Sequence, residues 1–111
     1  MAKKIYLSIP MIDKNYEEFI QAQAELSEKV SKYLNEDVSL AENVSPKTIK
    51  LNPAEYWLYF GERLGNMCKS DYVVFAEGYE NVKRCRIEYK VASEDDKKIL
   101  VEHGNEIQEV F

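Results

Sequence analysis

The sequence is short of the residues on which several common kinds of site depend. Its 111 residues include two cysteines, one histidine, three prolines and four glycines. Cys68 and Cys85 belong to no CxxC motif, and His103 is far from both along the chain. So few soft ligands argue against a zinc site, and two cysteines are too few for the disulfide framework of a secreted domain. We therefore expect no bound metal, and we expect both cysteines to be buried, reduced thiols.

Long hydrophobic runs and an excess of positive charge are also lacking. No apolar stretch approaches the ~18 residues of a membrane span, and residues 1–10 lack the features of a signal peptide. With 15 basic and 20 acidic residues, the net charge of −5 argues against a partner that is polymeric nucleic acid. We expect a single domain over residues 1–111, soluble and cytoplasmic, with no membrane partner.

Three well-known motifs are missing. The sequence has neither the GxGxxG motif of dinucleotide-binding folds nor the GxxxxGK[ST] motif of a P-loop. It also lacks the GxSxG elbow of serine hydrolases, and a single histidine argues against a serine triad. We expect no cofactor, and the candidate chemistry is left to carboxylates and tyrosines.

Four segments have the composition of strands. The expected strands are residues 4–10, 48–51, 71–76 and 99–101. Residues 35–46 are expected to form a loop, and residues 104–111 either an edge strand or a short helix.

Three helical segments alternate with these strands. Asn15 followed by Glu18 predicts a capping box at the start of the first helix. Its apolar stripe is expected to contain Phe19, Ala22, Leu26, Val30 and Tyr33. Asn52 and Pro53 indicate a second helix start. Its buried face is expected to contain Trp57, Phe60, Leu64 and Met67. The third helix is expected at about residues 82–94.

Alternation of strands and helices is typical of an α/β fold with a parallel sheet and helices on both faces. In such folds the ligand crevice lies beyond the carboxyl ends of the strands. The segments to consider for a site are therefore residues 8–15, 52–55 and 77–82.

Glu88 is the most informative carboxylate in the third expected helix. Cys85 and Ala92, three residues before it and four after it, share its face. A carboxylate in such apolar surroundings is desolvated, so it needs a partner or a raised pKa. The alternative is a solvent-facing Glu88 that pairs with Arg84, four residues earlier. Tyr6, on the first expected strand, is by itself more typical of a core residue than of a ligand-binding one.

Lys83, Arg84, Arg86 and Lys90 form a basic group in and after the first turn of the same helix. Cations there oppose the helix dipole, so a bound phosphate or nucleotide would relieve the conflict. The alternative is a solvated basic face that pairs with Glu80 or another acid.

Three segments carry a resemblance to a known family. They are residues 4–11 (KIYLSIPM), residues 56–71 (YWLYF through Leu64, Cys68 and Ser-Asp), and residues 78–92 (GYEN, then CRIEY and an alanine). Together they resemble the nucleoside 2-deoxyribosyltransferase superfamily, and most of all its small bacterial and phage domain of unknown function. The resemblance implies a flavodoxin-like three-layer sandwich with a four- to five-stranded parallel sheet.

The resemblance also implies a function and a set of site residues. It implies cleavage of, or deoxyribosyl transfer at, the N-glycosidic bond of a nucleoside or nucleotide. Glu88 would be the nucleophile and Tyr6 would orient it. The substrate-binding residues would be Ser8, Pro10, Met11, Gly78, Tyr79, Asn81 and Arg84. The resemblance further implies a homo-oligomer.

The sequence departs from the family pattern at three positions, and its loop after residues 10–11 has Ile12-Asp13 instead of the usual glycine. Val82 and Arg84 stand where the enzymes carry a polar sugar contact and a glycine, and Arg63 stands where they carry the aspartate that protonates the leaving base. These departures favour an alternative, namely a non-catalytic nucleotide-binding module with a degenerate active site. A structural or regulatory oligomer is a third hypothesis.

Overall fold

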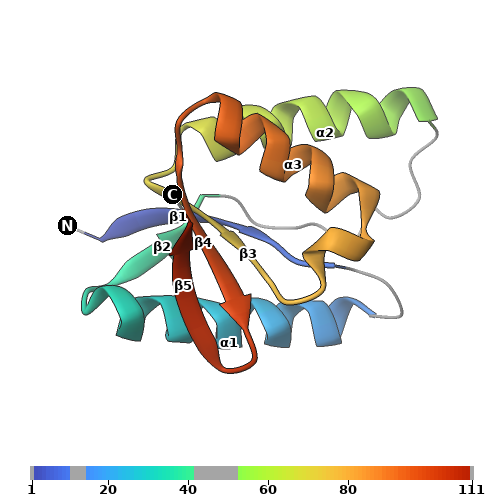
Figure 1. The fold of residues 1–111 in the computed structure, drawn as a ribbon. Coiled ribbons are helices and arrows are strands. Elements are labelled where there is room, and N and C mark those ends of the chain that lie inside the picture. Colours follow the sequence, from blue (N-terminus) through green and yellow to red (C-terminus); the bar gives the residue numbers. More distant parts are fainter. Residues whose placement is uncertain (1, 11–14, 42–52, 111) are drawn as a thin grey trace.

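The computed structural model describes residues 2–10, 15–41 and 53–110 as a five-stranded sheet flanked by helices (Figure 1). The strands are β1 (Lys3–Ser8), β2 (Val38–Leu40), β3 (Tyr72–Phe75), β4 (Lys98–His103) and β5 (Glu106–Val110). Their order in the sheet is β2-β1-β3-β4-β5. Strands β1 to β4 pair in parallel with one another, whereas β5 pairs antiparallel with β4. The expected α/β class is thus confirmed, with a sheet that is mixed rather than wholly parallel.

The short strand β2 lies where a loop was expected, so that prediction is wrong. The chain leaves the first helix through Asn35 in the left-handed conformation, with φ 56°. The amide of Lys3 then donates to the carbonyl of Asp37 at 3.0 Å, and pairing with β1 begins at once. A strand of three residues at the edge of a sheet is too short to show an alternating pattern. The strand expected at residues 48–51 lies outside the described residues.

Helix α1 (Tyr16–Leu34) covers one face of the sheet, and helices α2 (Pro53–Cys68) and α3 (Lys83–Glu94) cover the other (Figure 1). The expected capping box of α1 is confirmed, because the Asn15 side chain accepts from the Glu18 amide at 2.8 Å and the Glu18 carboxylate accepts from the Asn15 amide. Among the described residues, none of the helices has the length and apolar character needed to cross a membrane.

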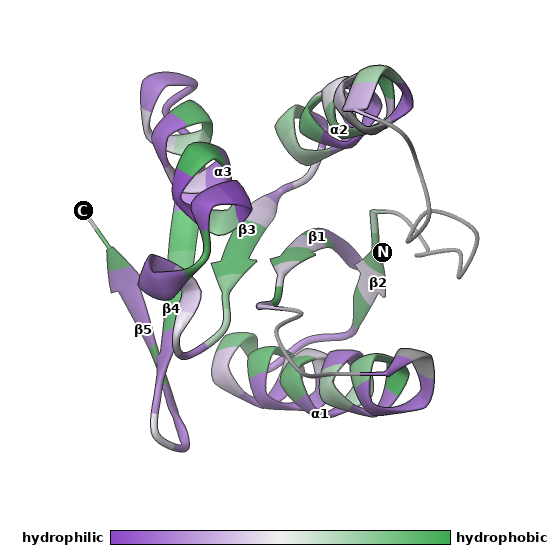
Figure 2. Cartoon of the chain, turned by 90° about the vertical axis from the view of Figure 1, so that its right-hand side faces the viewer, coloured by the Kyte–Doolittle hydropathy of each residue, from purple (hydrophilic) through white to green (hydrophobic). Residues whose placement is uncertain are grey.

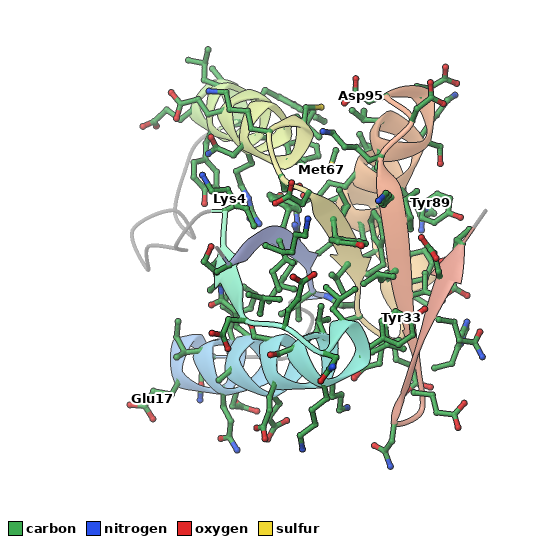
Figure 3. The ribbon with its side chains drawn as sticks, turned by 90° about the vertical axis from the view of Figure 1, so that its left-hand side faces the viewer. Lys4, Glu17, Tyr33, Met67, Tyr89 and Asp95 are labelled. Carbon is green, nitrogen blue, oxygen red and sulfur yellow. The ribbon has the colours of Figure 1, made fainter. Side chains whose placement is uncertain are left out.

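Side-chain alternation along β1 divides the core into two layers. Ile5, Leu7 and Ile9 pack with residues of α1. Tyr6 packs on the opposite face with Met67 of α2, which lies between that helix and the sheet (Figure 3). The central strands β3 and β4 are mostly hydrophobic, whereas β5 is mostly hydrophilic, as expected for an edge (Figure 2). The buried residues on one face of β1, Ile5 and Leu7, are therefore apolar, and those on its other face, Tyr6 and Ser8, carry the hydroxyl groups.

The buried face of α2 differs from the expected one. Phe60 and Met67 are buried, but Trp57 is 54% exposed, while Arg63 is only 6% exposed. At 3.6 residues per turn, Trp57 and Arg63 lie about 60° to either side of Phe60. The buried side of α2 is the one that carries Phe60 and Arg63, so the prediction that Trp57 is buried is wrong. Spacing alone does not show which side of Phe60 is buried, because Trp57 and Arg63 are both three residues from it.

Candidate functional site

Glu88 and Tyr6 meet in the interior between α3 and β1. The Glu88 side chain has no exposed surface, and it lies on the same face of α3 as Cys85 and Ala92, both also fully buried. The Tyr6 hydroxyl donates a hydrogen bond to Glu88 Oε2 across 82 positions of the sequence. The hypothesis of a solvent-facing Glu88 is therefore wrong, although the expected pairing with Arg84 does exist.

The other oxygen of the carboxylate has two donors. Ser8 Oγ donates to Glu88 Oε1 at 2.8 Å, and Arg84 Nη1 donates to the same oxygen at 2.9 Å. The second amino group of Arg84 donates to the carbonyl oxygen of Ile9 at 2.8 Å. We call Tyr6, Ser8, Arg84 and Glu88 the Glu88 network. Its carboxylate is fully buried, and three charged or neutral donors compensate for the lost solvation.

The Glu88 network lies at the carboxyl end of β1, in the middle of the sheet. Ser8 pairs in register with Phe75 at the end of β3, and Ile9 follows directly. The chain connects β1 to β2 on one side, and the strand order then continues through β3 and β4 on the other. The boundary between β1 and β3 is thus the point at which the strand order reverses, which is where open α/β sheets bind ligands.

Arg63 brings a second guanidinium group to this region from α2. Its central carbon lies 5.5 Å from the centre of the Tyr6 ring and 5.7 Å from that of Tyr59. Arg63 stacked in this way adds a cation–π interaction to the tyrosine that holds Glu88. Sequence reasoning noted Arg63 only as a departure from a family pattern; its position between Phe60 and Met67 was the signal for burial.

The Cys85 thiol also faces this cluster, and it is kept protonated. Burial raises the pKa of Cys85 most, the Glu88 carboxylate raises it further, and Arg84, Ser8 and Arg63 act in the opposite direction. A thiol with a raised pKa is a poor nucleophile. Cys85 is buried as expected, whereas Cys68 is partly exposed, which corrects that half of the prediction.

The remaining predicted binding residues border the same end of the sheet. Pro10 and Gly78 are neighbours, since a Cβ atom on Gly78 would lie 4.0 Å from Pro10 Cγ. Gly78 has φ +88°, a conformation that favours glycine. Tyr79 stacks on Tyr89 with ring centres 5.5 Å apart, and burial raises its pKa. Asn81 is exposed. Met11 lies outside the described residues.

The basic group at the start of α3 is only partly engaged with the protein. Arg86 donates to the backbone carbonyl of Glu80 at 2.9 Å, whereas Arg84 points inward to Glu88. Lys83 and Lys90 are exposed. The first turn of α3 contains no acidic residue, and Val82 at the N-cap provides no side-chain hydrogen bond. Arg84 alone therefore belongs to the interior network, and the other cations face solvent.

A separate pocket of 240 Å³ opens at the same edge of the sheet, against α1. Tyr6, Ser8 and Glu88 do not line it. Its acidic residues include Glu102, which pairs with Lys29 at 2.6 Å and accepts from the Glu77 amide. Among the described residues, no group of three or more histidine, cysteine or acidic side chains is arranged to hold a metal ion.

No family model and no curated protein matches the chain. Among solved structures, the fold is similar to that of a conserved protein from Enterococcus faecalis V583, with a TM-score of 0.56. The two share 15% sequence identity over 91% of this chain and 63% of that one, so this chain spans less than two thirds of that protein's length. At this level of identity the similarity shows a shared mixed α/β fold, and it leaves the chemistry to be argued from the Glu88 network.

Proposed function

We propose that this chain acts at the N-glycosidic bond of a nucleoside or nucleotide, cleaving the bond or transferring the deoxyribosyl group. Glu88 is the nucleophile in this proposal and Tyr6 is its orienting partner. The strand order 2-1-3-4-5 fits the flavodoxin-like arrangement that the family resemblance implies, with the antiparallel β5 as an added edge.

The observation that carries the proposal is the hydrogen bond from Tyr6 to a completely buried Glu88. Two residues that the resemblance assigns to nucleophile and orienting group, 82 positions apart, thus meet at the carboxyl edge of the sheet. A purely structural role does not account for a glutamate at this buried position. Burying a carboxylate is costly, and an apolar side chain of similar size would pack there at a lower cost.

The chemistry follows from the geometry of the carboxylate. A Glu88 oxygen forms a bond to C1′ of the sugar while the bond from C1′ to the base nitrogen breaks and the electron pair leaves with the base. The transition state has oxocarbenium character, and the product is a glycosyl ester of Glu88. Water then attacks C1′, the ester bond breaks, its electron pair returns to Glu88, and a proton from the water neutralises the departed base. A second base in place of water gives transfer.

Arg63 sets a limit on the leaving group. It stands near Tyr6 where the related enzymes use an acid, and a guanidinium donates hydrogen bonds but does not give up its proton in proteins. Loss of a general acid lowers a rate by about 10²–10⁴-fold. We therefore expect slow turnover, fastest with bases that leave readily as anions.

A second candidate function is binding without catalysis, and one observation favours it. Arg84 is held against Glu88 Oε1 with its side chain 13% exposed, at the position where the enzymes carry a glycine. In this structure the ion pair therefore engages an oxygen of the proposed nucleophile. In a binding module the pair would be permanent, and Glu88 would only hold the pocket in shape.

Release of free base separates the two functions. Wild type and Glu88→Gln are incubated with the four deoxynucleosides and their 5′-monophosphates, and free base is measured by chromatography, alongside binding by calorimetry. The proposal expects slow base release by the wild type and none by Glu88→Gln, with binding retained. Glu94→Gln, an exposed glutamate on the same helix, is the matched control and should behave as wild type. Binding with no release by the wild type would establish the binding module instead.

Neither binding nor release would leave the structural or regulatory oligomer as the remaining hypothesis. The homo-oligomer that the resemblance implies is tested independently by sedimentation of the purified protein.

A further inference from the structure

The Glu88 carboxylate is closed off by its own partners. It has no exposed surface, and Ser8 and Tyr6 have 0% and 1%. No molecule outside the protein reaches Glu88 unless one of these partners moves. Tyr6 and Ser8 are part of β1, which lies between β2 and β3, and both residues pair in register with β3. They cannot leave without opening the core.

Arg84 is the partner that can move. Its side chain retains 13% of its exposure, and its two hydrogen bonds, to Glu88 and to the Ile9 carbonyl, are made by the tip of a long flexible chain. Both bonds lie at the carboxyl edge, where a ligand approaches. When the guanidinium swings outward, Glu88 Oε1 keeps its bond to Ser8 and loses its bond to Arg84.

The movement has a cost that a suitable ligand offsets. The charge of Arg84 must find another acceptor, and the first turn of α3 contains no acid. Arg84 lies in the first turn of α3, at the positive end of the helix dipole, and Val82 at the N-cap offers no side-chain acceptor, so an outward guanidinium meets no compensating acid there. Glu80, next to Arg86, presents its backbone carbonyl rather than its carboxylate to that arginine. An incoming anion with several oxygen acceptors is therefore the partner that this surface favours, and phosphate accepts both amino groups of an arginine.

From this we infer that Arg84 is a gate that selects phosphate-bearing ligands, since its guanidinium exchanges the Glu88 carboxylate for the ligand's phosphate. This inference rests on the proposed function and specifies its substrate class as nucleotides rather than nucleosides. A nucleoside has no group to draw Arg84 away, so it meets a closed carboxylate. Arg84 is thus a specificity-determining residue, and binding of the correct substrate exposes the nucleophile.

The test compares paired ligands on paired variants by calorimetry. Each of the four deoxynucleosides and each 5′-monophosphate is titrated into wild type, Arg84→Ala and Lys90→Ala. Lys90 is an exposed cation on the same helix, so its removal makes the same change in net charge away from Glu88. Arg84→Lys is included because it keeps a positive charge beside the buried carboxylate, which protects the fold, while a single ammonium cannot form the fork.

We expect the wild type to bind monophosphates about 10- to 100-fold more tightly than nucleosides, the worth of a charged hydrogen-bonded contact. In Arg84→Ala we expect this preference to fall below about threefold, and nucleosides to bind more tightly than in the wild type, because entry no longer breaks an ion pair. Arg84→Lys should lie between the two, and Lys90→Ala should match the wild type.

A second measurement is independent of nucleotide affinity. Glu88 should resist modification by a water-soluble carbodiimide and an amine in the wild type and react at least about tenfold faster in Arg84→Lys, as read by mass spectrometry of its peptide. Equal reactivity would overturn the gate.

The outcomes of the binding experiment separate the inference from the proposed function. Base release with equal affinity for nucleosides and nucleotides would keep the proposed function and overturn the gate. Weaker binding of both ligand classes in Arg84→Lys would make Arg84 a structural residue and overturn the gate as well. A lack of binding by every ligand would overturn the proposed function and the assigned substrate class together.

Discussion

Replacing Arg84 by alanine should destabilise the fold far more than replacing any exposed cation. The ion pair joins a Glu88 side chain with no exposure to an Arg84 side chain that is 13% exposed. Removing the arginine leaves a buried carboxylate with one charged partner lost and an Ile9 carbonyl without its guanidinium donor. Loss of one member of a buried pair costs about 3–5 kcal/mol, because the remaining charge is no longer compensated.

For a domain of this size that loss is a large part of the total, which is about 5–15 kcal/mol. It should lower the melting temperature by roughly 10–20 °C. The matched control is the ion pair between Lys32 and Glu28 on α1, whose side chains are 78% and 70% exposed. Lys32→Ala removes one positive charge as well, and it should change the free energy of unfolding by less than about 0.5 kcal/mol.

Urea unfolding followed by circular dichroism measures both variants on one scale. The double variant Arg84→Ala with Glu88→Gln provides an internal check, because it removes the uncompensated charge and should recover at least half of the loss. A cost of under about 1 kcal/mol for Arg84→Ala would refute the reasoning. A double variant no more stable than the single one would show that lost packing, rather than buried charge, sets the cost.

Four further predictions concern the cap, the orienting tyrosine and the two thiols. Asn15→Ala should cost about 1 kcal/mol in urea unfolding, and Asn15→Asp should retain the stability, since its carboxylate still accepts the first-turn amide. Tyr6→Phe leaves Glu88 Oε2 without its donor, so base release should fall at least about tenfold in kcat with KM less affected; an unchanged kcat would remove the orienting role. Cys68 should react with iodoacetamide well before Cys85 in mass spectrometry of the native protein, and simultaneous reaction would contradict the assigned burial. Folding raises the pKa of Cys85 above its ordinary value of 9.0. The contribution of the protonated thiol to the free energy of unfolding is therefore fully present below pH 9.0 and is lost as the pH rises through the folded pKa. Cys85→Ala should lessen this loss of stability at alkaline pH in unfolding experiments.

The order of strands and helices could be predicted because each main element has a strong local pattern. The capping box at Asn15 and the apolar run of β3 are examples, and both are found where they were expected. The C-terminal segment was left open between strand and helix, and it is the strand β5. Ile107 is its one buried residue, and two apolar positions among glutamates and a glutamine are too weak a pattern to decide.

The sequence pointed to the residues of the candidate site, but it did not show how they are arranged. The spacing of Cys85 and Ala92 around Glu88 was compatible with a buried face but did not decide it, and the family resemblance favoured the buried position in which Glu88 lies. An arginine four residues before a glutamate, however, has the same spacing whether the pair faces water or the core. Only the approach of β1, which brings Ser8 and the Ile9 carbonyl, decides that Arg84 points inward. Tertiary contacts of this kind have no local signature.

The members of the Glu88 network are far apart along the chain, and this affects how the protein folds. Tyr6 and Ser8 contact Glu88 across 82 and 80 positions, so each contact closes a loop of most of the molecule. Such contacts are entropically expensive and form late, after local helices and neighbouring strands are in place. During synthesis β1 emerges long before α3, so the Tyr6 hydroxyl cannot reach Glu88 until the last third of the chain docks. No partly folded species can carry the site, and its appearance in a refolding experiment would report that both ends of the chain have come together.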